Sequence, residues 1–397
     1  MVPLFSKLKE LAMYTGARLE IMGGCDLQCL YCHAGEKNNK TCLASEMKLE
    51  RWSEIITEAK SLGIKRFTVT GGEPFLRSDW AEIVQLCGVE SQVFISTNGE
   101  HFSEENLKIL SGLPQVVEFR TSLDGLKTND IIRDGSSYQR TLASLKRLKE
   151  FLPQARIMVQ TTTYQNNLGE IEQLYDVLKD IPIDRWRLAQ LWKTVRTERN
   201  RHILDFSNYR LMFEMYGRII RRHQEDGQPF RLGIDNVYDS FITREEYVDF
   251  DMSAHPCLYE FDFLCINANG DLIFCPALNI PYASVKEASI MEAVSASSQL
   301  RDFKTITIGS LSCGNCRYLK ICGGGCRADA YRWLGDFRTL DPNACCIMRR
   351  VEEQILPLLN EAEQKVYNQL INSAGDWPPV DGENIEKAVA KFLEKGG

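Results

Sequence analysis

The chain has 397 residues, of which 44% are hydrophobic and 25% are charged, a composition typical of a globular protein with more than one domain. A formal net charge of −7 and a pI near 5.5 argue against a nucleic-acid-binding protein, which usually carries a basic face. The N-terminus lacks the apolar core of a signal peptide, and no run of about eighteen apolar residues could cross a bilayer, so we expect a cytoplasmic protein without membrane contact.

Strand-like and helix-like segments alternate along the first half of the chain. The run RLEIM alternates like a strand, and the loop CDLQCLYC follows it. Five further strand-like runs occupy residues 66–70, 92–96, 116–123, 156–162 and 185–191. Helix-period stretches separate the strands at residues 46–62, 79–88, 103–111, 137–151 and 169–179. This order predicts an α/β fold with a parallel sheet, a partial (β/α)6 barrel of the TIM type.

In such a barrel the active site lies at the carboxyl ends of the strands. The loop after the first strand contains Cys25, Cys29 and Cys32 within eight residues. The sequence GGEP follows the second strand, TNG the third and SLDG the fourth. A reducing cytosol does not preserve structural disulfides, so clustered cysteines indicate a metal site or redox chemistry. The five histidines are scattered, which leaves thiolate-bound zinc or iron–sulfur.

A second group of cysteines lies far along the chain. Four of them form C-x2-C-x5-C-x3-C between residues 313 and 326, and the pair Cys345 and Cys346 follows after eighteen residues. Upstream, Cys257 is separated from Gly270 by twelve residues, and Cys275 follows Gly270 after four. Considered alone, these spacings fit zinc and iron–sulfur equally well.

The C-x3-C-x2-C loop, with an aromatic residue before its third cysteine and GGEP after the next strand, resembles the radical S-adenosylmethionine (SAM) superfamily. The resemblance implies that Cys25, Cys29 and Cys32 hold a four-iron cluster whose open iron binds SAM. It implies that glycine lets the backbone approach the methionyl end of SAM, that Glu73 accepts from its ammonium and that Arg133 contacts its carboxylate. The full set of implied SAM contacts is Tyr31, Gly71, Gly72, Glu73, Ser122 and Arg133.

The second group of cysteines resembles the SPASM extension of that superfamily, which carries two auxiliary clusters. The resemblance assigns one cluster to Cys257, Cys275 and Cys326, and the other to Cys313, Cys316, Cys322 and Cys345. Cys265 either completes the first auxiliary cluster or is a buried apolar thiol, and Cys346 competes with Cys345 as the last ligand. The expected domains are a partial barrel at 1–230, a SPASM domain at 231–350 and a helical tail at 351–397.

By the same resemblance, the reduced cluster cleaves SAM to a 5′-deoxyadenosyl radical that removes hydrogen from a substrate C–H bond. Three substrate classes follow: a ribosomally made peptide, a small molecule such as a sugar, cyclitol or tetrapyrrole, and a sulfatase. Sulfatase maturases carry an aspartate where this chain has Pro276, which argues against the third class. A zinc scaffold or an electron carrier would explain the cysteines but not GGEP. No residue is identified as the catalytic base.

The peptide interpretation has consequences for partners. Only about seventeen residues precede the first strand, so we expect a separate leader-binding protein or recognition at the mouth of the barrel, with the basic residues of 193–202 as candidate contacts or as a solvated surface. An electron donor such as flavodoxin or ferredoxin is also implied.

Overall fold

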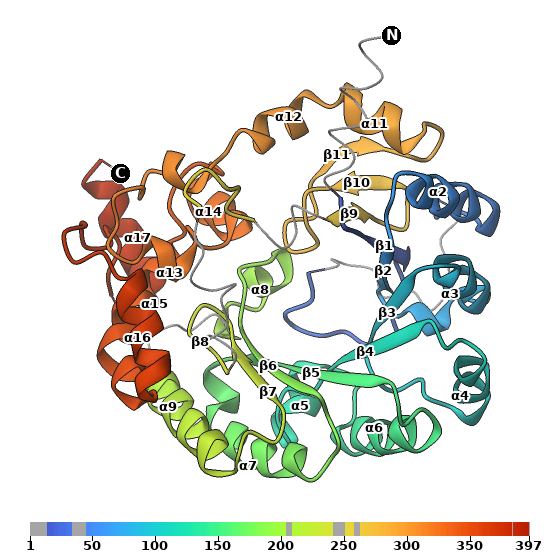
Figure 1. The fold of residues 1–397 in the computed structure, drawn as a ribbon, viewed down its shortest axis with the longest axis horizontal. Coiled ribbons are helices and arrows are strands. Elements are labelled where there is room, and N and C mark those ends of the chain that lie inside the picture. The colour runs from blue at the N-terminus through green and yellow to red at the C-terminus, as the bar shows by residue number, and fades with distance from the viewer. Residues whose placement is uncertain are drawn as a thin grey trace. The chain divides into compact units, whose positions relative to one another are not determined.

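The computed structural model describes residues 14–33, 45–203, 209–240, 251–257, 263–382 and 384–396. The chain folds into two compact units (Figure 1). Unit 1 consists of Met1–Leu123, Asn129–Val159 and Leu258–Asp302, and unit 2 of Asp124–Thr128, Gln160–Cys257 and Phe303–Gly397. Each unit is therefore assembled from three separate stretches of sequence.

Unit 1 is built on a sheet whose strands follow the order β11-β10-β9-β1-β2-β3-β4. These strands are β1 (Gly16–Met22), β2 (Arg66–Gly71), β3 (Gln92–Thr97), β4 (Val116–Ser122), β9 (Phe263–Ile266), β10 (Asp271–Ile273) and β11 (Pro281–Ser284). Strands β1 to β4 pair in parallel, and β9 is parallel to β1 on its other side. The carboxyl ends of β1 to β4 consequently lie at one edge of the sheet. Strand β5 (Arg156–Thr163) crosses from unit 1 into unit 2.

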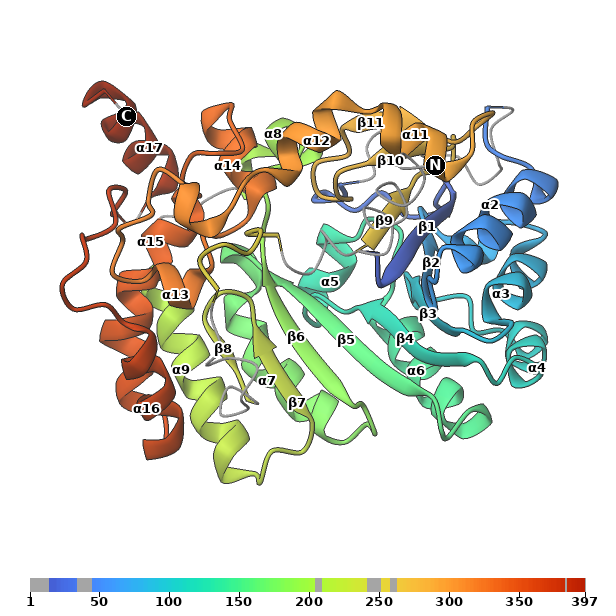
Figure 2. The same cartoon turned by 45° about the horizontal axis from the view of Figure 1, so that its top comes forward.

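Amphipathic helices cover the sheet of unit 1. They are α2 (Leu49–Ser61), α3 (Trp80–Gly88), α4 (Glu104–Ser111), α6 (Tyr138–Phe151) and α11 (Ile290–Ala296). Figure 2 shows α2, α3 and α4 in a row along the outer side of β1 to β4. Helix α2 buries Trp52, Ile55, Ile56 and Ala59, a spacing that places apolar side chains on one helical face. Ser103 and Ser137 cap α4 and α6 through their hydroxyl groups.

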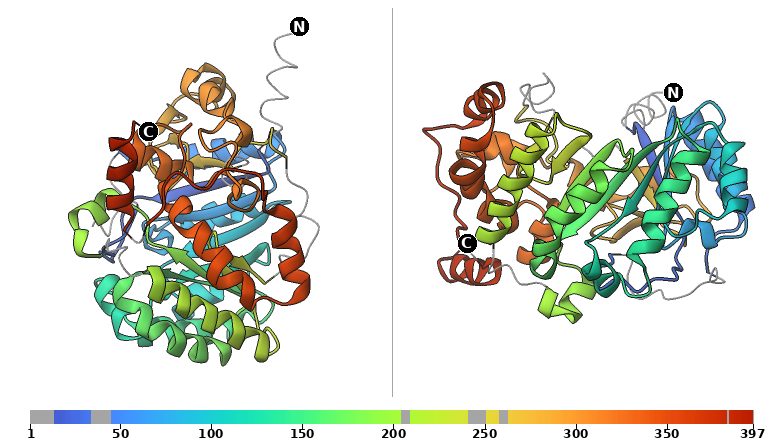
Figure 3. Two further views of the ribbon diagram at one scale, coloured as in Figure 1. Left: turned by 90° about the vertical axis from the view of Figure 1, so that its left-hand side faces the viewer. Right: turned by 90° about the horizontal axis from the view of Figure 1, so that it is seen from below.

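Unit 2 contains the strands β6 (Arg185–Gln190), β7 (Arg231–Ile234) and β8 (Tyr238–Asp239), with β6 and β7 parallel and β8 antiparallel to β7. Its helices include α7 (Leu168–Lys179), α8 (Val195–Arg199), α9 (Tyr209–Glu225), α13 (Leu319–Cys322), α14 (Arg327–Leu334), α15 (Pro342–Arg350), α16 (Glu361–Leu370) and α17 (Ile385–Glu394). Helices α7 and α9 lie side by side (Figure 3), and ion pairs join Arg218 to Glu172 and Arg222 to Asp176. Helix α5 (Lys127–Ile132) and helix α12 (Ser298–Lys304) cross between the units.

The predicted α/β fold with parallel strands is confirmed. All six predicted strands are present, and their bounds differ from the prediction by no more than two residues, as in Gly16–Met22 for RLEIM. The short elements α5, β7 and β8 were not predicted. In the part of the chain that the structure describes, no helix has both the length and the apolar character needed to cross a membrane.

Candidate functional site

The three cysteines of CDLQCLYC follow β1, at the edge of the sheet where the parallel strands end. All three residues are half-buried, as is Tyr31 between the second and the third. The amide of Leu27 donates to Cys25 Sγ at 3.4 Å. Burial raises the pKa of the Cys25 thiol to about 12, so a metal would be needed to hold this sulfur as a thiolate.

One side of the cysteine loop packs against the glycines of GGEP. The amide of Gly72 donates to the carbonyl of Met22 at 2.7 Å, and the amide of Glu73 donates to that of Gly24 at 2.9 Å. A Cβ on Gly71 would lie 2.2 Å from the Met22 oxygen, and a Cβ on Gly72 would lie 2.0 Å from the Gly24 oxygen. Glycine is therefore required here for the close approach of two backbones, whereas contact of these glycines with SAM stays a prediction.

The other side of the loop is held by the segment after α5. Two backbone hydrogen bonds, of 2.9 and 2.8 Å, join residues 28–30 to residues 132–134. Arg133 lies in this segment and is buried. Its guanidinium donates to the carbonyl of Ser122, at the end of β4, and to that of Asn98, just after β3, at 2.9 Å in the second case. The structure thus brings Arg133 and Ser122 together at the edge that carries the cysteine loop.

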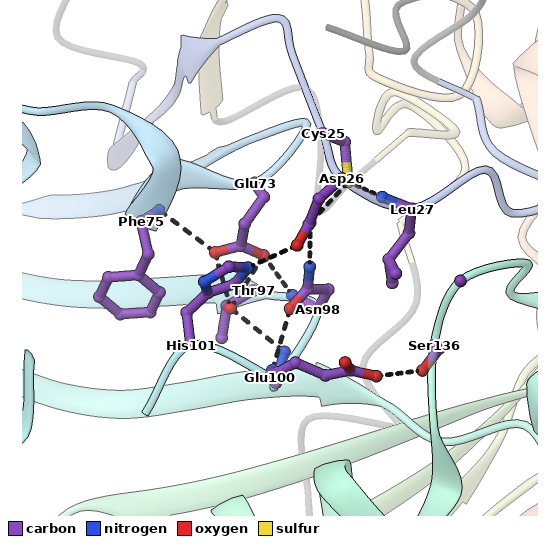
Figure 4. A network of polar contacts seen from close by, with 12 residues as sticks. Cys25, Asp26, Leu27, Glu73, Phe75, Thr97, Asn98, Glu100, His101 and Ser136 are labelled. Carbon is purple, nitrogen blue, oxygen red and sulfur yellow. Dashed lines mark hydrogen bonds and ion pairs between the residues drawn. The ribbon is translucent and has the colours of Figure 1, made fainter. Parts of the chain in front are cut away.

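Glu73 is fully buried, and its carboxylate accepts several hydrogen bonds (Figure 4). The donors are the amide of Phe75 at 3.2 Å, the hydroxyl of Thr97 at 2.9 Å and the amide of Asn98 at 2.6 Å. Burial raises the pKa of Glu73 to about 7, although the charge of His101 and the hydrogen bonds from the protein oppose the rise. The carboxylate therefore joins the ends of β2 and β3, and its contact with the ammonium of SAM stays a prediction.

Two residues that the sequence analysis did not single out belong to the same network, Asp26 and His101 (Figure 4). Asp26 Oδ1 accepts from the side-chain amide of Asn98 at 2.9 Å, and Asp26 Oδ2 lies 3.0 Å from His101 Nε2. Burial lowers the pKa of His101, but the hydrogen bond to Asp26 and the charge of Glu73 outweigh burial and raise the pKa above its ordinary value. The available signal was the position of both residues, one inside the cysteine motif and one directly after TNGE.

A second group of cysteines lines a small cavity in unit 2. The lining residues are Cys313, Cys316, Cys322, Gly324, Asp341, Ala344, Cys345, Met348 and Pro378. Burial raises the pKa of all four thiols. Cys345 is among the lining residues and its neighbour Cys346 is not. The four cysteines that the SPASM resemblance assigns to one auxiliary cluster are thus brought together.

Residues 372–378, called the closing segment below, contribute one residue, Pro378, to the lining of this cavity. Two backbone hydrogen bonds of 2.8 and 2.9 Å join Asp376 to residues 315–317, so that Cys316 lies opposite Asp376. The closing segment therefore contacts the loop that supplies two of the four cysteines.

The other predicted ligands are divided between the units. Cys257 and Cys326 belong to unit 2, and Cys265 and Cys275 to unit 1, where Cys265 is buried on β9. A common cluster on Cys257, Cys275 and Cys326 therefore stays a prediction, as does the role of Cys265. Among the residues that the structure describes, no three or more His, Cys, Asp or Glu side chains form a group that could hold a single metal ion.

Comparison with known proteins relates the site to a family. Residues 19–178 match the model of the Radical SAM superfamily. Over 357 residues the chain is 24% identical to the AdoMet-dependent heme synthase of Methanosarcina barkeri. This alignment covers 85% of this chain and 99% of the heme synthase. Over 376 residues it is 24% identical to the PqqA peptide cyclase of Granulibacter bethesdensis. This alignment covers 90% of this chain and 95% of the cyclase.

The fold is similar to a solved structure. The crystal structure of Streptococcus suis SuiB bound to the precursor peptide SuiA superposes with a TM-score of 0.66 at 18% identity. The superposition covers 86% of this chain and 78% of SuiB. The match to the family model, together with the three-cysteine loop and GGEP at the edge of a parallel sheet, identifies residues 19–178 as a radical SAM domain and the chain as an enzyme that uses SAM and an iron–sulfur cluster.

Proposed function

We propose that this radical SAM enzyme is of the SPASM type and modifies a ribosomally made peptide. The observation that carries the proposal is the similarity along nearly the whole chain to a peptide cyclase, which extends far beyond the radical SAM domain of residues 19–178. The fold similarity to SuiB, solved with its precursor peptide, supports it. The cavity lined by four cysteines in unit 2 supports a further iron–sulfur site.

The cysteine loop would hold the radical SAM cluster through Cys25, Cys29 and Cys32. Its donor set fits this group, because the loop offers three thiols and no fourth, which leaves one iron for SAM. When bound, the reduced cluster and SAM supply a 5′-deoxyadenosyl radical that removes a hydrogen atom from an unactivated C–H bond. Backbone hydrogen bonds to residues 72–73 on one side and to residues 132–134 on the other would restrain the chain that carries the three sulfurs.

The SAM contacts that we propose lie along the same edge of unit 1. Arg133 is the strongest candidate, because its buried guanidinium already binds two carbonyl groups there and suits a carboxylate. Glu73 would act from behind the loop, since its carboxylate accepts hydrogen bonds from Thr97 and Asn98 at the end of β3 and from the amide of Phe75, just after GGEP. The complete proposed set is Tyr31, Gly71, Gly72, Glu73, Ser122 and Arg133.

The enzyme would carry three [4Fe–4S] clusters in all. One auxiliary cluster would lie on Cys313, Cys316, Cys322 and Cys345, a set that the cavity of unit 2 supports. The other would lie on Cys257, Cys275 and Cys326, with Cys265 as a further candidate ligand. We assign residues 1–230 to the radical SAM barrel, 231–350 to the SPASM domain and 351–397 to the helical tail.

A second candidate substrate is a tetrapyrrole, because the heme synthase of M. barkeri is matched over 99% of its length. A sulfatase is a weaker candidate, since Pro276 stands where sulfatase maturases have an aspartate. For a peptide substrate we propose a separate leader-binding protein or recognition at the mouth of the barrel. In either case a flavodoxin or a ferredoxin would deliver the electron.

The test is anaerobic turnover with SAM, a reductant and candidate precursor peptides, with heme precursors tested in parallel. Mass spectrometry reads loss of hydrogen or a crosslink in the peptide. Deuterium placed in each substrate and recovered in 5′-deoxyadenosine reports which substrate gives up hydrogen. We expect label from the peptide, and the matched variant Cys29→Ala should give none.

Two outcomes would contradict the proposal. If deuterium reached 5′-deoxyadenosine only from the labelled tetrapyrrole, the substrate would be a tetrapyrrole and not a peptide. Colourless protein that contains zinc, instead of brown protein with about twelve irons, would contradict all three cluster assignments.

A further inference from the structure

The loop that carries the three cysteines has a polar anchor between its first two ligands. Asp26 follows Cys25 directly, and both oxygens of its carboxylate have partners from the segment after β3. The side-chain amide of Asn98 donates to Oδ1 at 2.9 Å, and His101 Nε2 lies 3.0 Å from Oδ2 (Figure 4). Partners at both oxygens restrict the orientation of the carboxylate and thereby tie the loop to the segment after β3.

The two partners of Asp26 are themselves held in place. The amide of Asn98 donates to the buried carboxylate of Glu73 at 2.6 Å, and Asn98 Oδ1 accepts from the amide of Glu100 at 2.9 Å. The carbonyl of His101 accepts from the side chain of Asn106, in α4, at 2.8 Å. The anchor therefore connects the cysteine loop to a fixed base that consists of the end of β3 and the start of α4.

Asp26 also belongs to the peptide group whose amide donates a hydrogen bond to the sulfur of Cys25. Asp26 supplies the carbonyl half of the peptide bond whose amide, on Leu27, donates to Cys25 Sγ at 3.4 Å. A rotation of Asp26 would turn this amide away from the sulfur. Hydrogen bonds to cluster sulfurs and partners behind the ligands set both the retention and the potential of a cluster.

We propose that Asp26 and His101 are positioning residues that hold Cys25 and its N–H···S hydrogen bond in the geometry required by the radical SAM cluster. The inference rests on the assignment of Cys25, Cys29 and Cys32 to that cluster. Neither residue needs to touch SAM or substrate, because both act through the cysteine loop, in which Cys25 Sγ also lies 3.9 Å from Asp26 Oδ1. His101 is required as a hydrogen-bond donor to Asp26, so another donor of similar reach should replace it.

The test compares two substitutions of one residue in the full-length, cluster-loaded enzyme. His101→Leu removes the donor, and His101→Gln keeps an N–H that can reach Asp26. The matched control is Ser103→Ala, which removes the N-cap of α4 two residues away without touching Asp26. The first measurement is the anaerobic rate of iron release to a chelator, and the second is the change in the electron paramagnetic resonance spectrum on addition of SAM, to which the cluster with an open iron responds.

We expect His101→Leu to release the radical SAM cluster about 10- to 100-fold faster than the wild type and to weaken the response to SAM, in the range typical of partners behind a metal ligand. His101→Gln should recover most of both properties, and Ser103→Ala should resemble the wild type.

Three results would overturn the inference. His101→Leu with wild-type iron release and spectra would show that the anchor has no effect on the cluster. If His101→Leu and His101→Gln lost iron and the response to SAM equally, His101 would not act as a hydrogen-bond donor. If Ser103→Ala showed the same losses, the effect of His101→Leu would reflect only the local stability of the segment that carries residues 101–103. Failure of the underlying cluster assignment is recognised separately, because Cys29→Ala would then keep all of its iron and its response to SAM.

Discussion

Substitution of Gly72 by alanine provides a direct test of how the cysteine loop is held. The added Cβ would lie 2.0 Å from the Gly24 oxygen, whereas ordinary contact begins at 3.4 Å. The obstacle is backbone, so the two loops must separate by about 1.4 Å, the difference between these distances. That movement breaks the 2.9 Å hydrogen bond from the Glu73 amide to Gly24. A lost hydrogen bond costs about 1 kcal/mol and overpacking about 1–3 kcal/mol, so we expect a local destabilisation of about 2–4 kcal/mol.

Hydrogen exchange read by mass spectrometry on peptides from residues 20–33 measures this local stability. A loss of about 2–4 kcal/mol should accelerate exchange roughly 30- to 1,000-fold in the loop. The matched control is Gly169→Ala, in α7, where a Cβ meets no atom within 4 Å. Alanine should be neutral or slightly stabilising there. Wild-type exchange in Gly72→Ala, or equal acceleration in both variants, would refute the reasoning from close approach.

Three further predictions concern the cysteines and Glu73. Cys29→Ala should abolish SAM cleavage while the auxiliary clusters remain, and wild-type amounts of 5′-deoxyadenosine from this variant under anaerobic conditions would contradict the assignment of the loop. Cys322→Ala should lose one auxiliary cluster, about four irons, and lower the thermal midpoint, because metal binding contributes to folding. Unchanged iron content by elemental analysis would count against a cluster in that cavity. Because burial raises the pKa of Glu73 from 4.5 to about 7, the folded protein binds this proton more tightly than the unfolded chain, and the stability gained is lost as the pH rises between these values. The free energy of unfolding of the wild type relative to Glu73→Gln, measured by urea denaturation, should therefore fall by roughly 1 kcal/mol per pH unit in that window, and a constant difference would show that Glu73 does not titrate there.

The strands and the longer helices of the first half of the chain could be predicted from the sequence. The strand Arg66–Gly71 and helix Leu49–Ser61 agree with the predicted 66–70 and 46–62 within a few residues, because apolar side chains recur at the strand or helix period. Helix Lys127–Ile132 was missed because six residues are too few to show a period. Its first turn is held by Glu170, which accepts from the amides of Leu126 and Thr128 across more than forty residues.

The candidate site was predictable where it depends on motifs and not where it depends on pairing between distant segments. The cysteine spacing and GGEP indicated the loop and its neighbour. The partners of Glu73 could not be read from its own surroundings, since Thr97 and Asn98 come from the next strand. Likewise, nothing in the local sequence of residues 372–378 indicates that Asp376 pairs with residues 315–317.

The position of the closing segment in the chain has a consequence for biosynthesis. Residues 372–378 come after all four cysteines of the cavity, the last of which is Cys345. A ribosome that has just completed Cys345 must add more than twenty further residues before the segment exists, and more still before it leaves the exit tunnel. A cluster inserted at this site during synthesis would therefore reach the four cysteines before Pro378 joins the lining of the cavity.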